Sequence, residues 1–371
     1  MAFLDIDRDE AVNLVGNLSC ASAPSGFEDE VCALVHEFAH HELSEGTTFT
    51  ETNLRNCLLK PAGMGDPAVE PEACRVLLDA HADEVGAMIK SIRPNGMMTF
   101  IQLGHYTTQA LAGEHFLVRN TQGDWLDAVV VAKPPHFQTA AEKASAQVSE
   151  FLLDCGATSA EDARENFHMA VGEPAVPATD FSYDTERGVM FGKAFDDRAG
   201  IAAMMLALKT LEETDTEFDY VATVSSQEEV GERGIGACVN WAQPNCAIMF
   251  EGAPADDQFA QPADIQCALK RGPMIRFADC TMITNPRFMR FALDVAAKYD
   301  IPVQTAVRDG GGTNAAATHV MYEGIPALVI SVPCRQIHAG CSIAAIEDVE
   351  NAARLGAAIV RELSCDVVDN F

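Results

Sequence analysis

Histidine and carboxylate residues gather directly after several short apolar runs of this sequence. Two imidazoles combined with several carboxylates form a donor set that suits Zn²⁺, Co²⁺ or Mn²⁺. A carboxylate shared by two such ions, about 3.5–4 Å apart, is the arrangement of two-metal hydrolases. The candidates come from five separate segments: His81 with Asp83 and Glu84, Asp196 with Asp197, Gln227 with Glu228 and Glu229, Glu251, and His338.

The adjacent glutamates 228 and 229 allow two different roles at one place. Neighbouring residues at a strand end point their side chains in different directions. One can therefore hold a metal ion, while the other takes a proton from the attacking water as general base. The residues alone leave open which is which. Asp196 is the natural bridge between two ions, because it opens a helix from a segment of its own.

Each of these pieces also has a simpler explanation when it is taken alone. The pair Asp196 and Asp197 could cap a helix and complement its dipole. Glu251 could be a surface acid, and His338 could be a loop histidine with ordinary partners. The joint placement of such residues in five segments favours a metal centre over five unrelated coincidences.

Alternating apolar runs and helical patterns must position these residues. Short runs at 75–79, 219–226, 246–250 and 326–333 are typical of buried strands. Helical patterns occupy 195–213, 286–300 and 346–363, and another is expected near 27–42, where Ser25 and Glu28 form a capping box. This alternation predicts a mostly parallel sheet covered by helices on both faces. Ligands bind beyond the carboxyl ends of strands in such sheets, which is where the candidates lie.

The middle of the chain has a different pattern. Between about 88 and 177, short apolar runs are interrupted by Pro-Asn-Gly and Thr-Gln-Gly-Asp, which are hairpin signals. We therefore expect a catalytic domain at 1–90 and 179–371, interrupted by an inserted β-rich domain at 91–178.

Composition excludes several functional classes. The 371 residues contain 25 Lys and Arg against 55 Asp and Glu, which gives a formal net charge of −30. Phosphate contacts need clustered basic residues, so neither nucleic acid nor an anionic membrane surface is an expected partner. No apolar run is long enough for a membrane span, and the N-terminus has no secretory pattern. The expected location is the cytoplasm, with the twelve cysteines reduced and mostly packed as small apolar residues.

A glycine loop is the second candidate for substrate contact. Asp309 precedes Gly310, Gly311, Gly312 and Thr313, and a helix is expected to follow. Bare backbone amides in such a loop could bind a substrate backbone or carboxylate. A tight turn without a binding role is the alternative. A phosphate site is disfavoured, because the Gly-Lys-Ser/Thr ending of a P-loop is absent.

An ordered series of motifs resembles the M42 family of metallo-aminopeptidases, which includes the TET peptidases. The similarity extends over almost the whole chain, and no single motif carries it. The motifs are PSGFEDEV (24–31), DAHADEVGAMI (79–89), KPPH (133–136), AFDDRAG (194–200), SSQEEVGERG (225–234), CALKRGPMI (267–275), GGGTNA (310–315) and EGIPALVISVPCRQIH (323–338).

The resemblance implies a three-layer α/β/α zinc-peptidase-like catalytic domain with an inserted β-barrel-like dimerisation domain. It implies one metal ion held by His81, Asp196 and Glu251, and a second held by Asp196, Glu229 and His338. Glu228 would be the general base, and Asp83 would orient His81. Peptide substrates and self-association as a dimer, or as a dodecamer, are further implications.

Two positions depart from the pattern of the resembled family. Many relatives carry Asp where this chain has Glu251, although either carboxylate can bind a divalent ion. The glycine loop ends in Asn314 rather than Asp, which keeps hydrogen bonding but removes a charge.

We therefore expect a two-metal aminopeptidase that removes the N-terminal residue from peptides. A metal-independent glycoside hydrolase of the cellulase kind is one alternative, although it would leave both histidines without a role. A non-catalytic metal-binding assembly protein is the other. A preference for acidic N-terminal residues would need a basic group in the side-chain pocket, for which Lys270, Arg308 and Arg335 are candidates.

Overall fold

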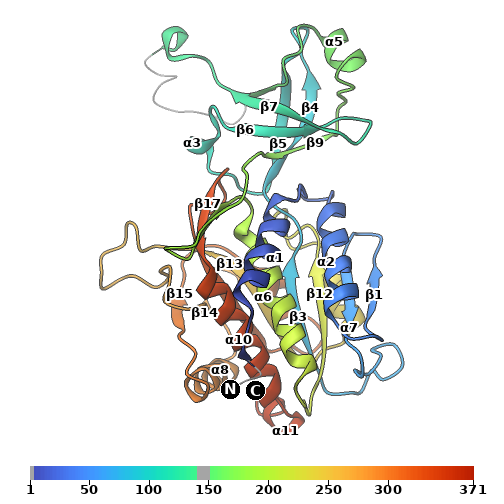
Figure 1. Cartoon of the computed structure of the whole chain (residues 1–371), viewed down its shortest axis with the longest axis vertical. Coiled ribbons are helices and arrows are strands. Elements are labelled where there is room, and N and C mark those ends of the chain that lie inside the picture. Colours follow the sequence, from blue (N-terminus) through green and yellow to red (C-terminus); the bar gives the residue numbers. More distant parts are fainter. Residues whose placement is uncertain (1–3, 140–150) are drawn as a thin grey trace.

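A large sheet flanked by helices and a smaller closed barrel make up the chain (Figure 1). The computed structural model describes residues 4–139 and 151–371. The barrel lies at one end of the molecule, and both chain termini lie near the opposite end (Figure 1). The architecture confirms the predicted α/β/α arrangement with an inserted barrel.

Four neighbouring parallel strands form the centre of the sheet, in the order β12 (Asp219–Ser225), β3 (Arg75–His81), β13 (Cys246–Pro254) and β16 (Ala327–Arg335). Every residue of β3 is buried, as expected for a strand covered on both faces. The remaining strands of this sheet are β1 (Thr48–Glu51), β2 (Cys57–Lys60), β10 (Ser182–Asp184), β11 (Val189–Gly192), β14 (Met274–Ala278), β15 (Gln304–Val307) and β17 (Ser342–Ala345).

Helices cover both faces of the sheet, because successive side chains of a strand point to opposite faces. Leu78 belongs to the apolar core shared with one set of helices, and Leu77 belongs to the core on the other face. The first set comprises α1 (Arg8–Cys20), α2 (Asp29–Glu42), α6 (Phe195–Glu212), α8 (Pro286–Lys298) and α10 (Ile346–Glu362); the second comprises α7 (Ile235–Ala242) and α9 (Asn314–Thr318).

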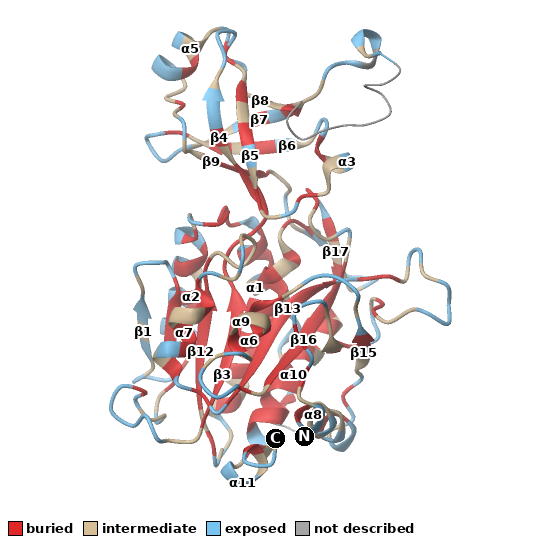
Figure 2. Cartoon of the chain, turned by 180° about the vertical axis from the view of Figure 1, so that it is seen from behind, coloured by how far each residue is buried: buried red, intermediate tan, exposed pale blue. Residues whose placement is uncertain are grey.

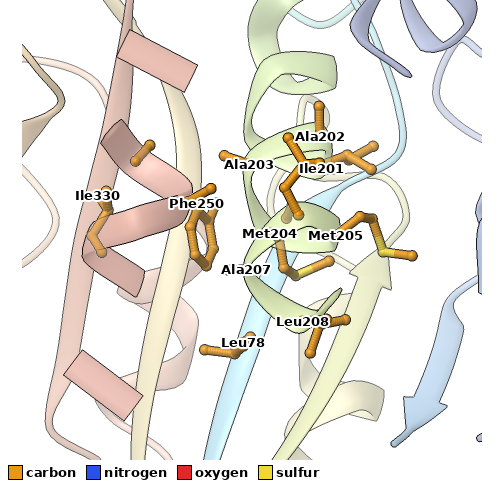
Figure 3. Packing of buried hydrophobic residues seen from close by; sticks show 14 of the residues in the cluster. Leu78, Ile201, Ala202, Ala203, Met204, Met205, Ala207, Leu208, Phe250 and Ile330 are labelled. Carbon is orange, nitrogen blue, oxygen red and sulfur yellow. The ribbon is translucent and has the colours of Figure 1, made fainter. Parts of the chain in front are cut away.

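Helix α6 is the central helix of the first face. Its residues are buried almost all round, because it lies between the sheet and helices α1 and α10. Figure 3 shows Met204 and Ala207 of α6 on the side facing Leu78 and Phe250 of the sheet. Gly356 of α10 allows close approach, since a Cβ at this position would lie 2.4 Å from the Phe250 ring. This packing holds the start of α6, with Asp196, at the sheet edge.

The barrel closes in the order β4 (Gly86–Ile92), β5 (Met98–Leu103), β8 (Leu152–Asp154), β7 (Trp125–Val131), β6 (His115–Arg119) and β9 (Pro174–Pro177). Its apolar core, around Phe116 and Val130, is separate from the cores of the sheet. The barrel strands occupy 86–177, while the division of domains at 91 and 178 stays a prediction. Short helices α3 (Thr108–Leu111), η2 (Pro135–Phe137) and α5 (Ala160–Glu165) connect these strands.

Burial follows this architecture (Figure 2). Buried residues concentrate in the central strands and in the helices against them, whereas loops and the outer surface of the barrel are exposed. Within the described ranges, we find no helix with the length and apolarity needed to cross a membrane.

Two local expectations from the sequence are wrong. Ser25 and Glu28 do not form a capping box: the Ser25 hydroxyl donates to Asp83 at 2.6 Å, and Glu28 accepts from the backbone N–H groups of Gly26 and Gln227. The cysteines are not all reduced, because Cys74 forms a disulfide with Cys365 of α11 (Cys365–Val368). The two cysteines are 291 residues apart, and only the fold brings them together.

Candidate active site

The structure brings the predicted acids and histidines together at the carboxyl ends of the central strands. His81 ends β3, and Glu228 and Glu229 follow β12. Glu251 lies in β13, and His338 lies in the loop after β16. Adjacent parallel strands end at the same edge of a sheet, so five distant segments meet at one place.

Asp196 lies between the two histidines. Its Oδ1 is 3.1 Å from Nε2 of His81, and its Oδ2 is 3.1 Å from Nε2 of His338. The side chain is largely buried, at 12% exposed. A single carboxylate thus directs one oxygen to each imidazole, which is the geometry that a carboxylate bridging two cations requires.

The other carboxylates flank this pair of imidazoles. Glu251 Oε1 lies 3.3 Å from Nε2 of His81, and Glu229 Oε1 lies 3.5 Å from Nε2 of His338. The Glu229 oxygen is buried without a hydrogen-bond partner among the described residues. A buried carboxylate oxygen without a partner lowers the stability of the folded state unless a cation or a hydrogen-bond donor binds to it.

The ring of His81 is held by its other nitrogen. Nδ1 lies 3.0 Å from the backbone carbonyl oxygen of Asp83 and therefore carries the proton and donates it. Nε2 is therefore the ring nitrogen directed toward Asp196 and Glu251, and it is the nitrogen that the imidazole would offer to a metal ion. The Asp83 carboxylate lies slightly farther from Nδ1, at 3.5 Å.

The Asp83 carboxylate also holds the segment that carries the two glutamates. It accepts hydrogen bonds from the backbone N–H groups of Glu228 at 2.9 Å and Glu229 at 3.2 Å. The hydroxyl of Ser25 supplies a third hydrogen bond. Asp83 is fully buried, so these contacts tie the ends of β3 and β12 to the N-terminal segment of the chain.

Asp197 provides an alternative ligand that the sequence analysis did not choose. Potential ligand atoms of His81, Asp197 and Glu251 lie within 4.8 Å of one another, as do those of His81, Asp196 and Glu229. However, Asp197 Oδ2 already accepts the backbone N–H of His81 at 3.1 Å. Asp196 lines the cavity and Asp197 does not. The contact of Asp197 with the backbone of His81 therefore suits it to position β3.

The acids and imidazoles of the cluster shift one another's pKa values. Burial raises the pKa of Glu229 to about 8 and that of Glu251 to about 7. Burial lowers the pKa of His338, but Glu229 and Asp196 outweigh it, and the pKa rises to about 9. Burial also raises the pKa of Asp196, but hydrogen bonds to His338 and His81 bring it well below the ordinary value. Crowded carboxylates of this kind are relieved by bound cations.

Glu228 is close to the cluster but less engaged with it. Its Oε2 is 3.9 Å from Nε2 of His81, beyond hydrogen-bonding distance. The side chain lines the cavity, and burial raises its pKa well above the value of free glutamate. A carboxylate with a raised pKa beside a ligand cluster has the properties of a general base.

The cluster opens into a cavity of about 620 Å³. Gly310, Gly311 and Gly312 line it, while substrate binding by Gly311, Gly312 and Thr313 stays a prediction. Thr313 lies behind them: it is fully buried, and its hydroxyl accepts the backbone N–H of Ala315 at the start of α9. The loop therefore presents bare backbone to the cavity, while its threonine caps the next helix.

Asn314 anchors the glycine loop to the sheet. Its Nδ2 donates to Asp79 Oδ2 at 2.8 Å and to Ser225 Oγ at 2.7 Å. Asp79 also accepts from the hydroxyls of Thr223 and Ser225. All these side chains are buried below the loop, so Asn314 holds the loop in place and does not face the cavity.

The three basic residues considered for specificity have different positions. Arg308 lines the cavity and pairs with Asp256 at 3.2 Å. Arg335 makes two hydrogen bonds to Asp257, and Lys270 donates to the backbone oxygen of Arg187. Neither of the last two lines the cavity.

Sequence reasoning missed several residues near the site. His105, Glu232 and Arg276 line the cavity, although no short motif marked them as site residues. Ser25 was assigned to a helix cap. The Pro-Ser-Gly sequence before α2 indicates a turn. The hydrogen bond from Ser25 to Asp83 joins residues that are 58 positions apart, so a local sequence pattern does not predict it.

Comparisons with known proteins show what the whole chain is similar to. Residues 67–355 match the sequence model of the M42 glutamyl aminopeptidase family. A lysyl aminopeptidase from Pyrococcus furiosus is 30% identical over 299 residues, which cover 78% of this chain and 82% of the relative.

Solved structures agree over nearly the full length. A TET aminopeptidase from the marine sediment archaeon Thaumarchaeota archaeon SCGC AB-539-E09 has a TM-score of 0.90 at 31% identity, covering 98% of this chain and 99% of the other. The TET1 peptidase of Pyrococcus horikoshii, which can assemble into a tetrahedron or a large octahedral shell, has a TM-score of 0.81 at 26% identity, covering 95% and 100%. This chain therefore belongs to the M42 family of aminopeptidases, metal-dependent hydrolases that act on peptide bonds.

Proposed function

We propose that the protein is a two-metal-dependent aminopeptidase that removes the N-terminal residue from peptides. One divalent cation, Zn²⁺ or Co²⁺ with Mn²⁺ as a further possibility, would be held by His81, Asp196 and Glu251. The second would be held by Asp196, Glu229 and His338. The observation that carries this proposal is the Asp196 carboxylate, whose two oxygens each lie 3.1 Å from a different imidazole.

The donor set fits such a pair of cations. Two imidazoles and three carboxylates suit borderline divalent metals. The Nδ1 contact of His81 directs Nε2 toward the carboxylates, and the buried Glu229 oxygen has no hydrogen-bond partner among the described residues. When bound, the two cations would lower the pKa of a water molecule and polarise the scissile carbonyl group.

Glu228 would move the proton in this reaction. Its carboxylate takes a proton from the attacking water and passes it to the nitrogen of the leaving amine. Asp83 supports this step with two of its groups. Its carboxylate accepts the backbone N–H of Glu228, and its backbone carbonyl oxygen orients the ring of His81.

The glycine loop would bind the peptide beside the cluster. Gly311 and Gly312 line the cavity without side chains, so a peptide backbone can approach their polar groups closely. Thr313 would support the loop through its helix cap.

Self-association and a cytoplasmic location complete the proposal. The TET1 peptidase of Pyrococcus horikoshii can assemble into a tetrahedron or a large octahedral shell, and its similarity covers 95% of this chain. We therefore propose a dimer as the unit and a dodecamer as the assembly. Light scattering of the purified protein tests both, and a monomer at working concentration would refute them.

The decisive experiment combines metal removal with one substitution. The wild-type protein is treated with chelator, dialysed, and assayed on aminoacyl-p-nitroanilides with Zn²⁺, Co²⁺ or Mn²⁺ restored. Glu228→Gln should lower kcat by a factor of about 10³ or more while bound metal per subunit is unchanged, since base catalysis is lost but the ligands remain. Glu323→Gln, which neutralises an exposed acid outside the cavity, is the matched control.

The alternatives give opposite results. A metal-independent glycoside hydrolase would act on cellulose in the presence of chelator and would not use His81 or His338. A non-catalytic metal-binding protein would bind metal but hydrolyse no aminoacyl-nitroanilide. Near-wild-type activity of Glu228→Gln would show that the base is assigned to the wrong residue.

A further inference from the structure

Most charged side chains that line the cavity belong to one of two groups, and in each group opposite charges offset one another. The first group is the candidate metal centre, whose four lining carboxylates would be offset by two divalent cations in the proposed function. The second group contains two arginines, each of which is paired with an aspartate. Arg276 lies 3.1 Å from Asp279, and Arg308 lies 3.2 Å from Asp256.

These two ion pairs are internal parts of the fold. The side chains of Arg276 and Asp279 are 5% and 0% exposed. Asp279 also accepts hydrogen bonds from Thr281, and Asp256 accepts the backbone N–H groups of Gln266 and Cys267. The arginines are therefore held to their aspartates, and each pair adds no net charge to the cavity wall.

Glu232 is the carboxylate that remains. It lines the same cavity, three residues after Glu229, and accepts a hydrogen bond from the backbone N–H of Ala317. Its Oε1 lies 3.1 Å from the position that a Cβ on Gly312 would occupy, so it is beside the glycine loop. Within the described parts of the chain, no ion pair within 4.0 Å joins this carboxylate to a Lys, Arg or His nitrogen, and His319 attracts it only from farther away.

We propose that Glu232 makes the pocket for the N-terminal side chain select basic residues, lysine or arginine, over acidic ones. The inference rests on the proposed aminopeptidase function and names the substrate class of the same site. An ammonium or guanidinium group placed beside Glu232 gains an opposite charge in a partly desolvated cavity, whereas a substrate carboxylate there is repelled.

The test measures kcat/KM for lysyl-, arginyl-, leucyl- and glutamyl-p-nitroanilide, with the metal-loaded full-length protein at one fixed salt concentration. The wild-type protein should prefer lysyl over glutamyl substrate. Glu232→Gln should lower this ratio about tenfold or more and change the leucyl rate by less than about twofold, since only charge is removed. Glu232→Asp, which keeps the charge, should retain the preference.

The matched control is Glu323→Gln, which removes one exposed negative charge outside the cavity and should keep the wild-type ratio. A wild-type preference for glutamyl substrate, or an unchanged ratio in Glu232→Gln, would overturn the inference. An equal loss for all four substrates would also overturn it, because it would show that Glu232 acts only through its contact with Ala317. A wild-type protein that hydrolyses none of the substrates would refute the proposed function itself.

Discussion

Replacing Asn314 by aspartate should destabilise the protein in a strongly pH-dependent way. Asn314 donates to Asp79 at 2.8 Å and to Ser225, and burial raises the pKa of Asp79 to about 7. The substitution puts two carboxyl groups at this distance in a fully buried place. Two carboxylates there cannot both be ionised, so above pH 7, where Asp79 of the wild type is ionised, the folded variant must keep a proton that the wild type has released.

The size of the effect follows from proton linkage. An unfolded aspartate has the ordinary pKa of 3.8, so holding one proton costs about 1.4 kcal/mol for each pH unit above it. At pH 8.5, where Asp79 of the wild type is ionised, the variant should be less stable than wild type by ~6 kcal/mol, and at pH 5.5, where Asp79 of the wild type already holds a proton, the loss should be smaller. Direct repulsion of two charges at 2.8 Å gives a similar ~6 kcal/mol with an effective dielectric constant of 20.

The stability contribution of Asp79 in the wild-type protein changes with pH in the same direction. Its pKa is raised in the folded state, so the folded protein binds a proton that the unfolded chain releases, and this group's contribution to stability falls as pH rises from about 4 to 7. Asn314→Asp adds a second group with the same dependence. Its penalty therefore grows with pH.

Urea unfolding at pH 5.5 and 8.5 provides the measurement. The exchange variant Asp79→Asn/Asn314→Asp is the control, because it restores one amide facing one carboxylate and should recover most of the loss at pH 8.5. Asn314→Asp within 1 kcal/mol of wild type at both pH values would refute the reasoning.

Two further predictions concern the site and the whole chain. Asp83→Asn should lower kcat about tenfold or more and weaken metal binding. The two carboxylate oxygens of Asp83 accept the backbone N–H groups of Glu228 and Glu229, and the amide nitrogen that replaces one oxygen cannot accept a hydrogen bond. Activity assays with chelator titration measure this, and values within twofold of wild type would contradict it. The Tm should rise by several degrees between about 0.1 and 1 M KCl. The acidic side chains behind the net charge of −30 repel one another, and salt shortens the screening length from about 10 to 3 Å. Calorimetry over a salt series measures this, with sucrose as the uncharged control, and a flat or falling Tm would contradict the charge argument.

The amino-acid sequence alone determined the local elements and the edge at which the site lies. Apolar runs such as 75–79 and 219–226 became the parallel strands β3 and β12, and the acids and histidines after them met because parallel strands end at one edge. This inference needs only local periodicity and one rule of sheet architecture. The family resemblance then followed from ordered motifs and is confirmed by the match over residues 67–355.

Only the tertiary structure decided which distant side chains touch. Asn314 contacts Asp79 across 235 residues, and Cys74 bonds to Cys365 across 291. Ser25 has the local pattern of a helix cap, but its hydroxyl donates to Asp83. Such contacts depend on strand order and layer packing, which local patterns do not encode. The same holds for Glu232, whose charge matters only because the fold pairs both cavity arginines with aspartates and leaves it beside the glycine loop.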